Sequence, residues 1–289
     1  MEKQADIQKE PPHRLRHWWR YFIASAIIPL LITAALLFIY FTQEQKADPT
    51  SARIIREVVA QRLHTNPNEL TNEDFASITT FRLKNIKLCD VKLLEKFTNL
   101  QELEMSSLRY PESAIPKWMI LLSKLGIYDF SKRFVIDLSP LEKLAKLEKI
   151  DIISTSVKDI KPLSNLINLK RLMLNRVQIT DLEPVMGLKN LRELIVIDAS
   201  ISNIEPLKGL TNLQVIEIGF SEISNLEPLR ELKNLQSLYL YQSAVYDLEP
   251  IKGLHNLQRL DLAHCKKITK EQIIDFQKLF PNIEISYGD

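Results

Sequence analysis

Few side chains in this chain have the type and spacing that catalysis or metal binding requires. Five histidines and two cysteines occur among the 289 residues, and no H-E-x-x-H, C-x-x-C or glycine-rich phosphate loop is present. His255 and His264 lie near each other, with Asp261 and Cys265 beside the second one. Zinc requires three or four ligands around one point, so solvated histidines at a strand end are the better interpretation. We therefore predict no catalytic residue, no metal site and no cofactor, and we do not expect an enzyme.

Glutamates also recur at a fixed spacing of 22 residues, each directly before a proline. The row consists of Glu183, Glu205, Glu227 and Glu249. Two carboxylates on adjacent repeats could suggest calcium, but the row lacks the mixed Asp, Asn and Gly chemistry of a calcium loop. We interpret it as a solvated acidic stripe on the outer side of a repeated structure.

The prolines define the elements that must position these side chains. Six prolines stand 22 residues apart in segments close to D/N-L/I-E/K-P-L/I, namely Pro140, Pro162, Pro184, Pro206, Pro228 and Pro250. Such a period is typical of a solenoid, in which stacked repeats bury one continuous core. An L-x-L alternation in each unit has the period of a half-buried strand. Proline donates no backbone hydrogen bond, so it fits an irregular outer segment.

Nine units can be recognised along residues 75–280. Those from Leu144 onward are regular. The unit Phe97–Leu121 is three residues too long, and Leu122–Lys143 is recognised through positions that include Tyr128 and Pro140. The last unit continues into a capped helix. The irregular units at the two ends of the array should act as caps, because every coil needs a neighbour on each side.

These units resemble the bacterial leucine-rich repeats of the internalin type, which read L-x-x-L-x-x-L-x-L-x-x-N-x-I-x-D-I-x-P-L. The resemblance covers roughly residues 52–262. The segment ARIIREVVAQRL…ELTNEDFASITTFRL is similar to the helical N-terminal cap of such arrays, and LDLAHCKKIT resembles the cysteine-containing type of repeat. The resemblance implies an α/β solenoid of about nine coils. It selects no function, since the same fold serves many unrelated binding roles.

The sequence departs from this pattern at the inward asparagine that bonds backbone groups between coils. The equivalent positions hold Thr155, Val177, Ala199, Ser221, Ser243 and Cys265. Val177 and Ala199 cannot supply such a ladder, so buried backbone groups must be satisfied by coil-to-coil bonds or by water.

A second feature precedes the repeats. Phe22–Phe41 is a run of twenty residues without a charge, long enough to span about 30 Å of hydrocarbon as a helix. A cleaved signal peptide would carry a shorter apolar core and a small-residue cleavage site. We therefore expect a retained transmembrane helix in contact with the lipid bilayer. Arg14, Arg16 and Arg20 precede it and fewer cations follow it, which predicts a cytoplasmic N-terminus and an extracytoplasmic repeat domain, in the periplasm or at the cell surface.

The predicted organisation has six parts. They are a cytoplasmic tail (1–21), the transmembrane helix (22–41), a linker (42–51), the N-terminal cap (52–74), the repeats with their C-terminal cap (75–280) and a tail (281–289). The first 41 residues hold five of the 38 basic and three of the 36 acidic residues, which leaves 33 of each. This balance argues against a nucleic-acid partner, because nucleic acids bind basic surfaces.

The residues beside the core positions of each strand should face the concave side of the sheet. Charged residues dominate there in the early coils, and apolar or aromatic ones gather in the fourth to eighth coils. The expected partner-binding residues are Ile153, Met173, Ile195, Ile197, Val215, Phe220, Tyr239 and Tyr241. An exposed patch of this kind marks an interaction site, although β-branched and aromatic residues also favour strands by propensity alone.

Two functions agree with these features. The first is a membrane-anchored interaction module that binds a protein or peptide through the concave face. The second is a non-catalytic accessory or assembly subunit of a larger membrane complex. About ten residues separate Phe41 from the predicted cap, which favours partners in the same membrane.

Overall fold

The computed structural model describes residues 49–88, 90–108 and 135–288. Two helices lie where the sequence predicts the N-terminal cap, α3 (Pro49–Leu63) and α4 (Asn72–Ala76). Helix α4 begins with a capping box, because Thr71 Oγ1 accepts the N–H of Asp74 and Asp74 Oδ2 accepts the N–H of Thr71. The hydrogen bonds from Thr71 lower the pKa of the Asp74 carboxyl. Reciprocal bonds of this type satisfy backbone donors that a helix start leaves open.

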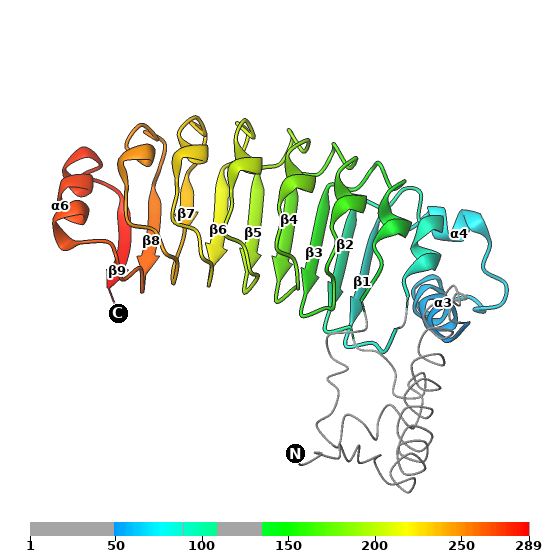
Figure 1. Cartoon of the computed structure of the whole chain (residues 1–289). Helices are drawn as coiled ribbons and strands as arrows, with labels where there is room; N and C mark the ends of the chain where they lie inside the picture. Colours follow the sequence, from blue (N-terminus) through cyan, green and yellow to red (C-terminus); the bar gives the residue numbers. More distant parts are fainter. Residues whose placement is uncertain (1–48, 89, 109–134, 289) are drawn as a thin grey trace, which may run out of the picture. The chain divides into compact units, whose positions relative to one another are not determined.

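The repeats form a parallel sheet in which every strand pairs with the next one along the chain (Figure 1). Its nine strands are β1 (Thr80–Lys84), β2 (Glu102–Ser106), β3 (Lys149–Ile153), β4 (Arg171–Asn175), β5 (Glu193–Ile197), β6 (Val215–Gly219), β7 (Ser237–Tyr239), β8 (Arg259–Ala263) and β9 (Glu284–Gly288). Neighbouring strands are in equal register, as in Leu172↔Leu194 and Leu194↔Ile216. This arrangement confirms the predicted leucine-rich repeat solenoid.

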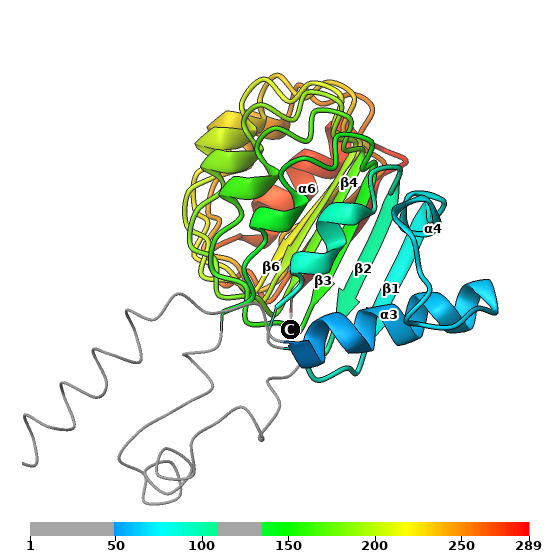
Figure 2. The same cartoon turned by 90° about the vertical axis from the view of Figure 1, so that its right-hand side faces the viewer.

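Short 3₁₀ helices follow on the side of the stack away from the strands, as the view along the stack in Figure 2 shows. They are η2 (Lys92–Lys96), η4 (Ser139–Leu141), η5 (Lys161–Leu163), η6 (Glu183–Val185), η7 (Glu205–Leu207), η8 (Glu227–Leu229) and η9 (Glu249–Ile251). From η4 onward each carries proline in its first turn, where the missing N–H has no partner to lose.

An Asp or Asn side chain starts each proline-containing 3₁₀ turn. In the coil of η6, Asp181 Oδ1 accepts the N–H of Glu183 at 2.8 Å, and Asn203 does the same for Glu205 at 2.9 Å. Such a bond imitates a backbone turn. The periodic D/N-x-E/K-P motif therefore builds the outer turn of each coil.

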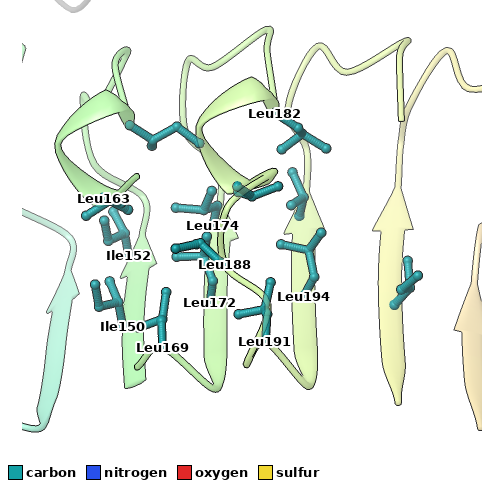
Figure 3. Packing of buried hydrophobic residues seen from close by; sticks show 14 of the residues in the cluster. Ile150, Ile152, Leu163, Leu169, Leu172, Leu174, Leu182, Leu188, Leu191 and Leu194 are labelled. Atoms are coloured by element: carbon teal, nitrogen blue, oxygen red, sulfur yellow. The ribbon is translucent and has the colours of Figure 1, made fainter. Parts of the chain in front are cut away.

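Leucine and isoleucine side chains from the strands and the outer turns meet in one continuous core. Figure 3 shows Ile150, Leu163 and Leu172 within it, and all three are fully buried. Strands β1–β6 and β8 each contribute at least two core residues, β7 contributes Leu238, and each described 3₁₀ turn contributes at least one more. Truncating such a side chain to alanine typically costs about 2–5 kcal/mol of stability.

The unit predicted at Leu122–Lys143 is described only from residue 135 onward. Strand β2 pairs directly with β3, as in Glu104↔Asp151, and among the described residues eight of the predicted units supply a strand. The described part of this unit, with Leu138 and η4, closes the coil that β2 begins. Residues 109–134, which include Tyr128 and its L-x-L-like pattern, lie outside the described residues.

The C-terminal segment is more ordered than the predicted tail at 281–289. Helix α6 (Lys270–Leu279) starts at a capping box between Thr269 and Gln272. The chain then returns to the sheet as β9, which pairs with β8. Ile283 and Phe280 are buried in the core here, so this segment covers the end of the stack.

Within the described ranges, no helix combines the length and the apolar character that crossing a membrane requires. The predicted span Phe22–Phe41, the segment 1–21 and most of the 42–51 linker lie outside those ranges.

Asparagines tie neighbouring coils together, but not at the consensus position. Their Nδ2 atoms donate to a backbone carbonyl of the preceding coil at 2.7–2.8 Å, in Asn99, Asn168, Asn190, Asn212, Asn234 and Asn256. At the consensus position, Val177 and Ala199 are simply buried, and Cys265 Sγ donates to the Leu240 carbonyl at 3.1 Å. The ladder therefore lies just before strands β2 and β4–β8, instead of just after each strand.

Candidate functional site

The solvent-facing side of the nine strands, called the sheet face below, carries three rows of side chains. The middle row runs through Arg82, Glu104, Asp151, Met173, Ile195, Glu217, Tyr239, Asp261 and Ser286. Because the strands are parallel and in register, consecutive members stand on neighbouring strands about 4.8 Å apart. The sheet face is thus a surface on which equivalent positions of successive coils are placed side by side.

Ion pairs cover the sheet face from β1 to β5. Glu104 lies 2.7 Å from Lys84 Nζ and 3.5 Å from Arg82 Nε. Arg171 on β4 lies between Asp151 on β3, at 3.1 Å, and Glu193 on β5, to which it is hydrogen-bonded. Opposite charges on adjacent strands support the pairing.

Burial lowers the pKa of the Arg171 guanidinium, but its hydrogen bonds and ion pairs with Glu193 and Asp151 outweigh that effect and raise the pKa above the ordinary value. The Arg171 guanidinium is therefore already bound by two carboxylates of the same chain.

Apolar side chains replace the charges in the centre of the sheet face. Met173 and Ile195 are neighbours in the middle row, and Ile153, Ile197 and Val215 are half-buried beside them. Ile195 is only 7% exposed, so it offers little contact surface. The central apolar patch is therefore narrower than the sequence predicts.

Aromatic residues occupy the sheet face over β6 and β7. The Tyr241 hydroxyl donates to Glu217 Oε1 at 2.9 Å, and its ring lies over Gly219, where a Cβ atom would stand 2.2 Å from the ring. Phe220 packs edge-on against it, with ring centroids 5.6 Å apart. Burial, followed by the hydrogen bond to Glu217, raises the pKa of Tyr241. Tyr241 is therefore fixed in place, and Tyr239 stands on the strand beside Glu217.

A left-handed residue follows each strand from β1 to β8. Its φ angle lies between 51° and 59° at Asn85, Ser107, Ser154, Arg176, Asp198, Phe220, Gln242 and His264. The N–H of Phe220 donates to the Tyr241 carbonyl of the next coil at 3.1 Å. This backbone conformation aims the Phe220 ring, which is 49% exposed, outward at the end of β6. The ring borders a shallow hollow of about 500 Å³ that Val177 and Ala199 also line.

Sequence reasoning located the aromatic residues but missed the two that support them, Glu217 and Gly219. A glycine inside a strand signals close approach of another group, and that signal was available at Gly219. Nothing in the sequence pairs Glu217 with Tyr241, because the two are 24 residues apart.

The described residues hold no group of three or more His, Cys, Asp and Glu able to bind a metal ion. Two of the four outer glutamates, Glu227 and Glu249, form ion pairs with cations of their own turns. Arg230 Nε donates to Glu227 at 2.8 Å and lowers the pKa of that carboxyl.

No protein-family model matches this sequence, and no curated protein matches it. Among solved structures, internalin C2 from Listeria monocytogenes has a TM-score of 0.68 and 26% identity, over 84% of this chain and 99% of that one. This chain has an internalin-like leucine-rich repeat fold. Internalin F from the same species has a TM-score of 0.46 at 19% identity, covering 81% of this chain and 90% of that one. A leucine-rich repeat protein of Leptospira interrogans has a TM-score of 0.43 at 20% identity, covering 75% and 74%.

The structural similarity to internalin C2 extends over nearly the whole of that chain. It agrees with the sequence-based expectation for the coils and their proline turns. This similarity concerns the repeat fold, whereas the chemistry of the sheet face depends on the side chains that this chain places there.

Proposed function

We propose that this chain is a protein–protein interaction module that binds a protein or peptide through the sheet face. One observation carries the proposal: the sheet face changes from ion-paired charges on β1–β5 to half-buried apolar and aromatic side chains on β4–β7, with the exposed ring of Phe220 at the end of β6. Aromatic residues and methionine are enriched at protein interfaces, whereas self-paired surface charges contribute little. Phe220 is exposed, and Met173 and Tyr239 are half-buried side chains of this chemistry.

The proposed module is anchored by Phe22–Phe41, with its N-terminus in the cytoplasm and its repeats outside. The uncharged length of this segment and the arginines before it support that topology. The accessory-subunit alternative rests on a short connection, since α3 begins at Pro49, only a few residues after the predicted span. Such a connection favours a partner that resides in the same membrane.

The test of the binding face uses partner recovery from solubilised membranes after cross-linking. Replacing Met173 and Tyr239 with alanine should reduce recovery of the partner at least tenfold, because truncating central interface residues of this type costs about 1–2 kcal/mol each or more. Tyr241 and Ile195 are unsuitable for this test, since one is held by Glu217 and the other is buried.

The matched control replaces Glu183 and Glu205, exposed residues of the outer row, with alanine. That variant should recover the partner as the native chain does. If the outer-row variant loses the partner and the sheet-face variant keeps it, the binding face has been assigned to the wrong side.

The topology is tested with reporters fused after Asp289. A reporter that is active only outside the cytoplasm should work there, because the repeats follow an N-in span. Activity of a cytoplasmic reporter alone would contradict this orientation. A mature chain that starts near residue 45 would contradict the retained anchor.

A further inference from the structure

The charges on the sheet face are balanced in one half and unbalanced in the other. From β1 to β5, three of the four carboxylates on the face, those of Glu104, Asp151 and Glu193, lie within 4 Å of a cation, and the fourth, Glu102, is matched in number by the four cations of these strands. From β6 to β8, Glu217 and Asp261 form no ion pair with any residue that the structure describes. Arg259 is the cation that these strands place on the face, and it pairs with Glu284 of β9 at 3.2 Å. Two carboxylates are thus left without a counter-charge.

These two carboxylates flank one aromatic ring. The register Glu217↔Tyr239↔Asp261 places Tyr239 between them in the middle row. With about 4.8 Å between neighbouring strands, the backbones that carry the carboxylates lie about 10 Å apart. A group resting on the Tyr239 ring is therefore within reach of both acids.

Both carboxylates are already oriented by the protein. Glu217 Oε1 accepts the hydroxyl proton of Tyr241 at 2.9 Å, and Asp261 Oδ1 accepts the N–H of Ala263 at 2.9 Å. Among the described residues, the second oxygen of each carboxylate has no hydrogen-bond donor. Each acid thus has one oxygen held and one available, so little side-chain entropy is lost when a donor binds.

We propose that this part of the sheet face binds an arginine side chain of the partner, stacked on Tyr239 between Glu217 and Asp261. The proposal rests on the proposed function and names the chemistry that the partner must present there. A cation over an aromatic face is attracted by the ring's negative face. A guanidinium is planar, stacks on aromatic rings and spreads five donors in its plane, whereas an ammonium is a compact and strongly hydrated charge. Two separated acceptors beside a ring therefore favour arginine over lysine.

The test uses small probes, so it does not depend on identifying the partner. N-acetyl-arginine amide is titrated against the full chain in detergent, and binding is followed by saturation-transfer NMR of the probe. N-acetyl-citrulline amide, which has nearly the same shape without the charge, is the matched probe. Arginine amide should bind at least about tenfold more tightly than citrulline amide, since charge-assisted bonds exceed neutral ones in strength.

The matched variants are E217Q/D261N and E193Q. Glutamine and asparagine keep the oxygens that accept from Tyr241 and Ala263, so the first variant removes the charges and preserves the internal hydrogen bonds. It should abolish the preference for arginine amide over citrulline amide. E193Q removes a carboxylate that Arg171 already occupies and should leave the preference intact.

Equal binding of the two probes by the native chain, or no binding of either, would overturn the arginine site. Binding of N-acetyl-lysine amide as tight as that of the arginine probe would overturn the choice of arginine. These outcomes are separate from the test of the proposed function, because partner recovery after the Met173 and Tyr239 substitutions does not require the partner to present an arginine. Loss of recovery together with equal probe binding would leave the binding face standing without this site.

Discussion

At the scale of single residues, polar side chains in the repeats serve either the backbone or the sheet face. Asparagines such as Asn190 and Asn212 bond the preceding coil, and Asp181 starts an outer turn. Glu217 belongs to the second group, because it holds the Tyr241 hydroxyl on the sheet face and also faces solvent. The sequence shows these residues recurring every 22 positions, but it does not show which of their atoms bond to which partners.

Thr155 is the buried side chain for which a substitution should raise stability. Its side chain is 4% exposed, and its Oγ1 has no hydrogen-bond partner in the described structure. The equivalent position of the next coil holds Val177. Thr155→Val should therefore increase the free energy of unfolding by about 1 kcal/mol, because it removes a buried polar group left unpaired. Urea denaturation of both chains checks this, and a lower midpoint for the variant would contradict it.

Gly219 should be needed for the placement of Tyr241. A Cβ atom there would lie 2.2 Å from the ring, so Gly219→Ala should displace the ring and break its bond to Glu217. The pKa of Tyr241 should then fall back toward its ordinary value, because burial and that bond are what raise it. Ultraviolet titration of the tyrosines should show one more of them ionising near pH 10.

Gly187→Ala is the matched control for this change. Its Cβ atom would meet only the Ser164 carbonyl oxygen, at 3.6 Å, which is an ordinary contact. The tyrosine titration of that variant should equal that of the native chain. An unchanged titration in Gly219→Ala would show that the ring is not held as described.

At the scale of elements, the sequence predicted the coils well and their interruptions poorly. The strand and proline pattern repeats so regularly from Leu144 onward that strand positions follow directly from it. The regular succession of units would place one more strand between β2 and β3, but these two strands pair directly with each other. Strand β9 was missed because Ile285 stands outside the 22-residue frame and follows a helix. Short apolar patterns are reliable only when the repeat supports them.

The N-terminal helices should be required for the stability of the first coils. Ile55 and Val59 of α3 are fully buried against the array, and Phe75 and Phe81 both pack on Phe97. Deleting residues 50–74 should expose this apolar end and cause aggregation. Size-exclusion chromatography and thermal melting of the two chains provide the measurement.

Val59→Asp is a smaller test of the same contact and should lower the melting temperature, because it buries an unpaired charge. Arg53→Ala is its control on the same helix, since the Arg53 side chain is 71% exposed. A deletion variant that stays monomeric with an unchanged melting curve would contradict the capping role.

At the scale of the whole molecule, the site could be predicted only in outline. The position of the sheet face follows from strand alternation, and Met173 and Tyr239 lie on it. Side-chain burial and pairing were not predictable, because they depend on residues one or more repeats away. Ile195 is covered, Tyr241 is hydrogen-bonded, and Arg171 is held between two acids. That Glu217 and Asp261 form no ion pair can be recognised only when these pairings are known.

The pairing order of the strands has a consequence for how the array folds. Most paired residues on neighbouring strands are one repeat apart in the sequence, as Lys149 is from Arg171. The pairing of β2 with β3 instead brings together Glu102 and Lys149, which are about two repeats apart. Loop-closure entropy grows with the logarithm of loop length, so closing this longer loop costs about 0.7 kcal/mol more than closing an ordinary one. Pairing of β2 with β3 is therefore the step between neighbouring coils that is slowest to form. The six coils on its C-terminal side can fold together before the first two coils and their cap pack onto them.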